Sequence, residues 1–261
     1  MGPPPGRPLI PVNDPLMRED AGTRLETALT EIAEAIDVQF DRLLPVPEDQ
    51  RARLYEAMRY SAIGGGKRLR PLLVKASCDL FNIGWESAVR AGLAVECIHV
   101  YSLIHDDLPA MDNDDMRRGK PTAHRAFDEA TAILAGDCLH DLAFAVLADE
   151  RTHADAAVRC ELIASLALAS GPVGMAGGQM MDLVAETTQF DLPAITRLQL
   201  LKTGALIAFC LEAGAIFARI PEDRRTSLRG YAHDVGLAFQ IADDLLDIEG
   251  DAAVTGKAVG K

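Results

Sequence analysis

The sequence has few aromatic residues and an excess of negative charge. Phenylalanine, tryptophan and tyrosine make up only 5% of the 261 residues, whereas alanine and leucine are abundant. Because aromatic side chains favour strands while alanine and leucine favour helices, this composition favours a helical fold. The 26 lysines and arginines are outnumbered by 39 aspartates and glutamates, which leaves a net charge of −13. Nucleic-acid binding depends on clustered basic residues, so no nucleic-acid partner is expected.

Signals for disulfides, export and membrane insertion are also absent. The five cysteines are scattered and form no CxxC pair, which favours free thiols in a reducing cytosol over a disulfide framework or a zinc site. Residues 1–22 begin MGPPPGRPLIPVNDP and have neither the charged nor the apolar segment of a signal peptide. We find no apolar run of the roughly 18 residues that span a bilayer. We therefore expect a cytoplasmic protein with no stable membrane association, and a flexible proline-rich arm over residues 1–22.

Apolar residues recur at helical spacing through the rest of the chain. Thr23 and Glu26 form a T-x-x-E capping box, so the first helix is expected to begin there and to end before Pro45. Further helices are expected at 49–61, 70–81, 86–108, 124–148, 155–181, 192–219 and 226–249. The glycines between 171 and 178 predict a kink or a close backbone approach. The predicted fold is all-α, a single large helical bundle over residues 23–261 around a central cavity.

Charged residues concentrate between His99 and Arg118, in the stretch HVYSLIHDDLPAMDNDDMRR. Five aspartates fall within ten residues there, and such a cluster is costly unless cations neutralise it. Carboxylate oxygens are the ligands that hard divalent cations prefer, and the adjacent Arg117 and Arg118 carry guanidinium groups suited to phosphate. Carboxylates for metal beside guanidinium groups for phosphate indicate a metal–diphosphate site.

A second acidic group lies near the end of the sequence, in the stretch QIADDLLD at 240–247. Asp243 and Asp247 are four residues apart, so a helix places both on one face. The surrounding residues are apolar, so these carboxylates belong to an otherwise buried-looking helix. The two acidic groups can share metal ions only if the fold brings these distant segments together.

The two groups resemble the aspartate-rich motifs of the trans-isoprenyl diphosphate synthase family, of the bacterial farnesyl diphosphate synthase (geranyltranstransferase) type. Asp106-Asp107-x-x-x-x-Asp112 with Arg117 and Arg118 resembles the first motif in its longer form, and Asp243-Asp244-x-x-Asp247 resembles the second. Other family signatures follow in order, at Gly65-Gly66-Lys67-Arg68-Leu69-Arg70-Pro71, His99, Lys202-Thr203 and Gln240. The resemblance implies a homodimeric prenyltransferase that condenses isopentenyl diphosphate with dimethylallyl or geranyl diphosphate and releases diphosphate.

The resemblance also implies roles for individual residues. Mg2+, or alternatively Mn2+, would be held by Asp106, Asp107, Asp112, Asp243, Asp244 and Asp247. The allylic diphosphate would be held by Arg117, Lys202, Thr203, Gln240 and Lys257, and isopentenyl diphosphate by Gly66, Lys67, Arg70, His99 and Arg118. The catalytic group, which would neutralise the departing diphosphate, comprises Asp106, Asp112, Arg117, Lys202 and Asp243.

Product length is expected to depend on Tyr101 and Ser102, about one helical turn before Asp106. By the family's logic a bulky Tyr101 forms a floor to the cavity and stops the product at farnesyl diphosphate. Geranylgeranyl diphosphate is the alternative if Tyr101 turns aside, and a tyrosine that only packs in the core is the simpler interpretation. Family members continue past the position of Lys261, so the C-terminal helices are expected to be missing from this chain.

Three other interpretations stay open. A class I terpene cyclase uses the same ionisation, although its second metal motif mixes Asn, Ser and Glu, unlike the aspartates at 243–247. A di-iron carboxylate bundle uses Glu-x-x-His pairs, and this chain has two, Glu96/His99 and Glu150/His153. A non-catalytic homologue that serves as a subunit partner is the third.

Overall fold

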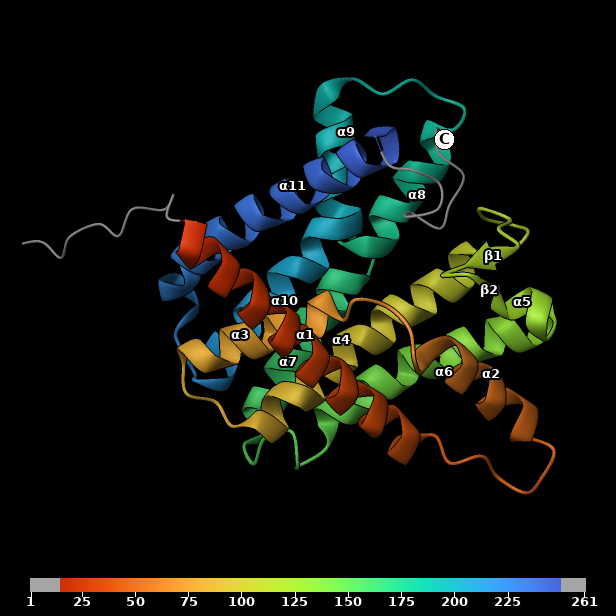
Figure 1. The fold of residues 1–261 in the computed structure, drawn as a ribbon, viewed down its shortest axis with the longest axis horizontal. Coiled ribbons are helices and arrows are strands. Elements are labelled where there is room, and N and C mark those ends of the chain that lie inside the picture. Colours follow the sequence, from red (N-terminus) through yellow and green to blue (C-terminus); the bar gives the residue numbers. More distant parts are fainter. Residues whose placement is uncertain (1–14, 250–261) are drawn as a thin grey trace, which may run out of the picture.

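A computed structural model describes the backbone of residues 15–249 and the side chains of residues 20–238 (Figure 1). The helices are α1 (Pro15–Leu43), α2 (Ala52–Ala62), α3 (Leu69–Leu80), α4 (Trp85–Asp106), α5 (Ala123–Ala126), α6 (Glu129–Ala148), α7 (Ala156–Ser170), α8 (Met175–Ala185), α9 (Leu192–Gln199), η1 (Leu200–Gly204), α10 (Ala205–Phe217), η2 (Glu222–Arg225) and α11 (Thr226–Glu249). In the described backbone the only strands are β1 (Met116–Arg117) and β2 (Lys120–Pro121), which form one antiparallel hairpin beside α5. The predicted all-α fold is confirmed.

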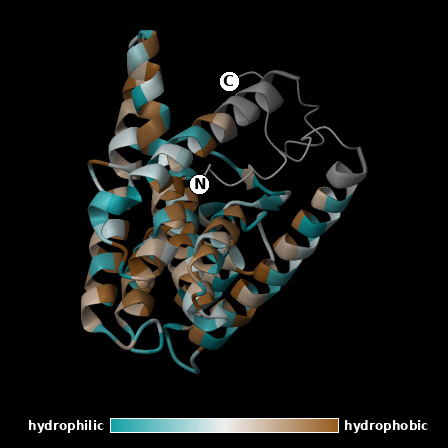
Figure 2. Ribbon diagram, turned by 90° about the vertical axis from the view of Figure 1, so that its left-hand side faces the viewer, coloured by the Kyte–Doolittle hydropathy of each residue, from teal (hydrophilic) through white to brown (hydrophobic). Residues whose placement is uncertain are grey.

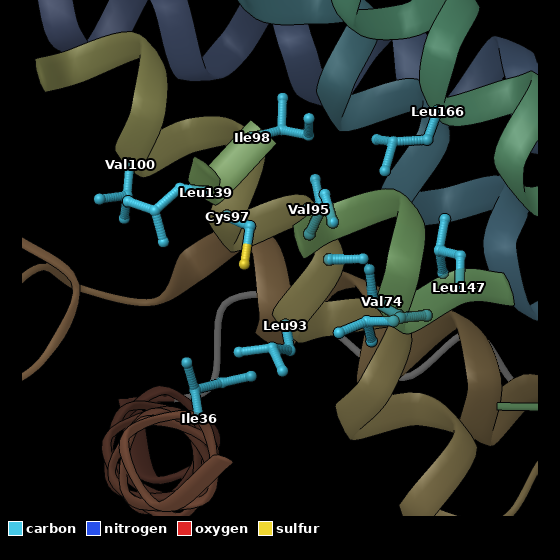
Figure 3. Packing of buried hydrophobic residues seen from close by; sticks show 14 of the residues in the cluster. Ile36, Val74, Leu93, Val95, Cys97, Ile98, Val100, Leu139, Leu147 and Leu166 are labelled. Carbon is cyan, nitrogen blue, oxygen red and sulfur yellow. The ribbon is translucent and has the colours of Figure 1, made fainter. Parts of the chain in front are cut away.

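α4 is the central helix of the bundle. It packs against α1, α2, α3, α6 and α10, and every residue from 88 to 98 is buried. A helix that is apolar on all sides is stable only when other helices surround it. Figure 3 shows this packing, with Leu93 of α4 facing Ile36 of α1 and with leucines of α6 and α7 nearby. The surrounding helices therefore determine where the C-terminal end of α4 lies.

The outer helices bury one face each. On α1, Ile32, Ile36 and Phe40 recur every four residues and are each at most 1% exposed. Figure 2 shows hydrophobic and hydrophilic residues alternating along the helices, and hydrophilic residues in the loops that join their ends. Helices of this kind gain most of their stability from the buried face rather than from intrinsic propensity.

The predicted start of the first helix at Thr23 is wrong. α1 begins at Pro15, so Thr23 lies inside the helix, where its carbonyl accepts a hydrogen bond of 2.9 Å from the Thr27 hydroxyl. The T-x-x-E pattern therefore caps nothing. Proline is favoured as the first helical residue because its missing N–H would be unpaired there anyway, and residues 16–22 contain no second proline that would end the helix. Residues 1–14 of the predicted arm lie outside the described residues.

Three of the predicted long helices are interrupted. The helix expected over 124–148 breaks at Phe127 and Asp128 into α5 and α6. The helix expected over 155–181 breaks at Gly171–Gly174 into α7 and α8, which confirms the kink predicted from the glycines. The helix expected over 192–219 contains the π-helical turn η1, and such turns frequently occur at functional sites. A Cβ atom added to Gly178 of α8 would lie 2.2 Å from the backbone nitrogen of Lys202. The backbones of α8 and η1 are therefore in contact here.

The expectation that no segment could span a bilayer needs correction. By length and composition alone, four helical segments in the described part of the chain qualify, at Trp85–Asp106, Glu129–Ala148, Ala156–Ala185 and Leu192–Phe217. They qualify because a stretch of 18 residues that contains one or two charged residues can still have a high mean hydropathy. Each of the four contributes residues to the hydrophobic core of the bundle.

We predict that Gly214→Ala destabilises the fold while Gly230→Ala does not. A Cβ atom at Gly214 of α10 would lie 2.2 Å from the Ser77 carbonyl oxygen of α3, and such overpacking costs about 1–3 kcal/mol. A Cβ atom at Gly230, also helical, meets nothing within 4 Å, so the alanine should stabilise α11 by up to about 1 kcal/mol. Urea denaturation measures both. Equal stability of Gly214→Ala and the wild type would contradict the close approach of α3 and α10.

Candidate active site

A cavity of about 350 Å³ opens between the C-terminal half of α4, α8 and η1. Its wall includes seven residues that the sequence analysis singled out, namely Arg70, His99, Tyr101, Ser102, Asp106, Lys202 and Thr203. These residues come from the consecutive helices α3 and α4 and from η1, which is far from both in the chain. The apolar residues of the wall include Met111, Met175, Met180 and Leu183, to which no sequence motif pointed. The cavity wall therefore combines charged groups with apolar side chains.

Asp106, the last residue of α4, is an acidic group of this cavity. Burial raises the pKa of its carboxyl to about 6, against the effect of the nearby Lys202 and with a further rise from Asp112. The Asp112 N–H donates a hydrogen bond of 2.8 Å to the Asp106 carbonyl, so the chain folds back over the helix end. A buried carboxylate whose charged form is disfavoured is one that a bound cation stabilises.

Asp107 lies in a different environment from Asp106. It is 3% exposed, accepts a hydrogen bond of 2.7 Å from Arg117 Nε and lies 2.6 Å from Arg117 Nη2. Together with Arg117 and Arg118 it lines a second, smaller cavity of about 80 Å³ next to Gly64 and Gly65. Asp107 and Arg117 neutralise each other in this structure, so their roles as metal ligand and diphosphate ligand stay predictions.

The described acidic side chains supply only part of the ligands that a hard divalent cation needs. Among side chains of residues 20–238, no three His, Cys, Asp or Glu residues converge on one point. Asp106 and Asp112 nevertheless supply two neighbouring carboxylates, and magnesium commonly takes one or two carboxylates together with substrate phosphate oxygens. A divalent cation held jointly with a phosphate therefore suits this donor set better than a cation held by protein alone.

The second predicted metal group lies on α11. The backbone is helical through 240–247, as predicted, and α11 packs against η1, which carries Lys202 and Thr203. The side chains of Gln240, Asp243, Asp244 and Asp247 lie outside the described residues, as does all of Lys257. Their predicted roles are therefore untested.

A group of positive charges surrounds His99. The pKa of its imidazole is held well below the usual range by burial and then by the charges of Arg70, Arg118, Arg117 and Arg68. His99 is therefore neutral near pH 7. Positive charge at this density in a partly buried place favours binding of an anion.

Two of these four arginines are already paired with acidic groups. Arg68 is paired with Asp37 and Glu96, and Arg117 with Asp107. Within the described side chains, Arg70 and Arg118 have no ion-pair partner. Among the described residues, the Nε atom of Arg70 is also buried without a hydrogen-bond partner, and so is Nε2 of Gln179 in the same cavity. Buried donors without acceptors are costly, so a ligand with several acceptor oxygens fits here.

Gly66 makes room for Arg118. The hairpin between β1 and β2 turns through Arg118 and Gly119, both with positive φ (53° and 73°), as a two-residue turn of type I′ requires. A Cβ atom on Gly66 would lie 2.7 Å from Arg118 Nη2, so any larger residue there would displace the guanidinium group from its present position. Lys67 follows on the same loop and is exposed.

Lys202 of η1 lies 2.5 Å from the Asp182 carboxylate of α8, so this lysine in an apolar segment has a partner in the protein itself.

Tyr101 faces the cavity, as its predicted role requires. Its ring makes edge contacts with the rings of His105 (5.7 Å) and His140 of α6 (5.0 Å). No motif pointed to His140, because α6 becomes a neighbour of Tyr101 only in the folded bundle, whereas His105 is one turn after Tyr101 on α4 itself.

The di-iron interpretation conflicts with the structure. Glu96 is 2% exposed and accepts a hydrogen bond of 2.7 Å from Arg68, so it is not free to bind metal with His99. Glu150 is exposed in the turn after α6. The two Glu-x-x-His pairs therefore do not form one site.

The chain is similar to known proteins over most of its length. The Polyprenyl synthetase family profile matches residues 51–261. The farnesyl diphosphate synthase of Escherichia coli (strain K12) is 48% identical over 220 residues, which cover 84% of this chain and 73% of that protein. The geranylgeranyl diphosphate synthase of Cyanophora paradoxa is 42% identical over 217 residues, which cover 83% and 72%.

Solved structures show the same similarity. The apo crystal structure of an FPP/GFPP synthase from Zymomonas mobilis superposes with a TM-score of 0.84 at 64% sequence identity, covering 86% of this chain and 82% of that chain. A geranyltransferase from Legionella pneumophila superposes with a TM-score of 0.81 at 37% sequence identity. The match covers 88% of this chain and 81% of that chain.

We predict that Asp106 links metal binding to diphosphate binding. Inorganic diphosphate should bind the wild type at least about tenfold more tightly with Mg2+ than without it, a difference of ~1.4 kcal/mol, and Asp106→Asn should lose that difference. Asp115→Asn is the matched control, because Asp115 is an exposed aspartate of the same segment that pairs with Arg125 at 2.5 Å. Isothermal titration calorimetry measures all three proteins. An undiminished effect of Mg2+ in Asp106→Asn would remove Asp106 from the metal site.

Proposed function

Since this chain belongs to the polyprenyl synthetase family, we propose that it is a short-chain trans-prenyltransferase that joins isopentenyl diphosphate to dimethylallyl or geranyl diphosphate and makes farnesyl diphosphate. The observation that carries the proposal is the cavity that places the buried carboxylate of Asp106 near the unpaired guanidinium group of Arg70 and the neutral ring of His99. The Escherichia coli relative is named for the same product.

Family membership implies a divalent metal ion, and we propose Mg2+, with Mn2+ as the alternative. When bound, the ion neutralises negative charge on the departing diphosphate. Asp106 and Asp112 would hold it, together with the aspartates at 243, 244 and 247. α11 packs against η1, and η1 lines the same cavity as Asp106, which suits a ligand lying between the two acidic groups.

The residues of the cavity would then bind and orient the two substrates. Lys202 and Thr203 on η1 face the allylic diphosphate, while Lys67, Arg70, His99 and Arg118 face isopentenyl diphosphate. The allylic carbon–oxygen bond breaks with its electron pair leaving on diphosphate, and the terminal alkene carbon of isopentenyl diphosphate forms the new carbon–carbon bond. The released diphosphate accepts the proton that is lost, so no side-chain base is required. The methionines of the wall exclude water from the allylic cation.

Two rival functions have less support. A class I terpene cyclase would need one diphosphate site, whereas Arg70 and Arg118 offer donors for a second. Burial raises the pKa of Asp106, and the nearby donors of Arg70 and Gln179 lack acceptors among the described residues. Both features are unfavourable without a ligand, and a non-catalytic homologue would have no need of them.

We further propose that the protein is a cytoplasmic homodimer without stable membrane association. Ile133 (43% exposed) and Leu134 (53% exposed) are neighbours on α6 and offer apolar surface for a second copy. Free cysteines suit a reducing compartment. Light scattering should give twice the chain mass of 28.1 kDa, and a mass of one chain at micromolar concentration would contradict the dimer.

The product and its length can be tested in one experiment. Incubated with isopentenyl and geranyl diphosphate and Mg2+, the wild type should make mainly the C15 product, and a chelator should abolish product formation. Tyr101→Ala should shift the main product to C20 or longer, because it removes the aromatic part of the cavity wall. Tyr231→Ala is the control, since Tyr231 is 60% exposed on α11. The products are separated by chromatography. If Tyr101→Ala and the wild type make products of the same length, Tyr101 does not determine product length.

A further inference from the structure

We propose that Asp37 and Glu96 are positioning residues that act through Arg68 to hold the Gly64–Lys67 loop in the conformation that binds isopentenyl diphosphate. Neither carboxylate lines the two cavities described above, so we assign each a role that it exerts through other residues. The inference rests on the proposed function, because that function assigns the substrate to this loop.

Arg68 connects three segments of the bundle. It is 2% exposed, and its Nη1 donates a hydrogen bond of 2.7 Å to Glu96 Oε1 on α4. Its Nη2 donates to Asp37 Oδ1 on α1 at 2.6 Å and to the Ala62 carbonyl at the end of α2 at 2.5 Å. Charge-assisted bonds of this kind are strong and directional, and the bond between Arg68 and Glu96 is also shielded from water. The position of Arg68 is therefore determined by α1, α2 and α4 together.

Asp37 binds both ends of the loop. Its second oxygen, Oδ2, accepts a hydrogen bond of 3.0 Å from the Gly64 N–H, while Oδ1 accepts from Arg68 four residues later. Gly64, Gly66 and Arg68 all have positive φ (73°, 85° and 48°). For arginine that conformation costs on the order of 1 kcal/mol or more, so it persists only where surrounding contacts impose it. Asp37 supplies two of those contacts.

The loop in turn supports the groups that bind the anion. The Arg118 guanidinium group lies against Gly65 and Gly66, and Arg70 is in the first turn of α3, which Arg68 precedes as N-cap residue. Glu96 is three residues before His99 on α4, so Arg68 also ties the loop to the helix that carries this histidine. Because Asp37 and Glu96 together outweigh the charge of Arg68, this arginine holds the loop and leaves substrate binding to Lys67, Arg70 and Arg118.

The test is Asp37→Asn, which keeps the shape of the side chain and removes the charge that pairs with Arg68. The dissociation constant of isopentenyl diphosphate, measured by calorimetry, should rise about tenfold, as is typical when an outer group that orients a binding residue is lost. The KM for isopentenyl diphosphate should rise similarly, while the KM for geranyl diphosphate and kcat stay within about twofold of the wild type. Glu96→Gln should show the same separation between the two substrates, which provides a second variant if one fails to fold.

The matched control is Asp41→Asn. Asp41 is one turn further along α1 and forms an ion pair of 2.5 Å with Arg59, away from the loop, so all of these constants should stay unchanged. Wild-type affinity for isopentenyl diphosphate in Asp37→Asn, or an equal rise in both KM values, would overturn the positioning role. If the wild type forms no prenyl product, the proposed function fails, while the comparison of dissociation constants still decides the role of Asp37.

Discussion

The burial of α4 on every side is the constraint on which the site depends. From Ala88 to Ile98 no face of this helix is open to water, so five neighbouring helices determine its position. Each fully buried leucine or isoleucine contributes about 1.5–3 kcal/mol, which makes displacement of the helix costly. His99, Tyr101, Ser102 and Asp106 follow on the last two turns and reach the cavity in a set order and direction. A rigid core helix thus presents the polar residues at its end.

The charges of the site are balanced in some places and unbalanced in others. Arg68 and Arg117 are matched by acidic partners, whereas Arg70 and Arg118 are unmatched among the described side chains. The raised pKa of Asp106 and the lowered pKa of His99 both report groups whose charged forms are disfavoured by burial. A ligand that brings positive charge to Asp106 and negative charge to the arginines would relieve both imbalances. A metal–diphosphate pair has that distribution of charge.

The sequence predicted most of the helices and many of the polar residues of the cavity, and its errors have physical causes. Spacing placed Ser102 on the face of the helix that carries Asp106, because a helix fixes which residues share a face, whereas the resemblance to the family placed Tyr101 in the wall. Spacing could not separate Asp106 from Asp107, since which carboxylate meets an arginine depends on the hairpin that carries Arg117. The π turn at Lys202 lies where Gly178 of another helix approaches the backbone, and no local sequence pattern predicts it. Asp37 looks in the sequence like any exposed aspartate of an amphipathic helix, and only the packing of α1 brings it to Gly64.

The most direct test of the central claim is anomalous diffraction from manganese in crystals that contain Mn2+ and a non-reactive allylic diphosphate analogue. The structure predicts a manganese peak at coordination distance from the Asp106 carboxylate, with the diphosphate of the analogue between that ion and η1. Manganese bound away from Asp106, or the analogue bound in the smaller cavity beside Asp107, would contradict this account.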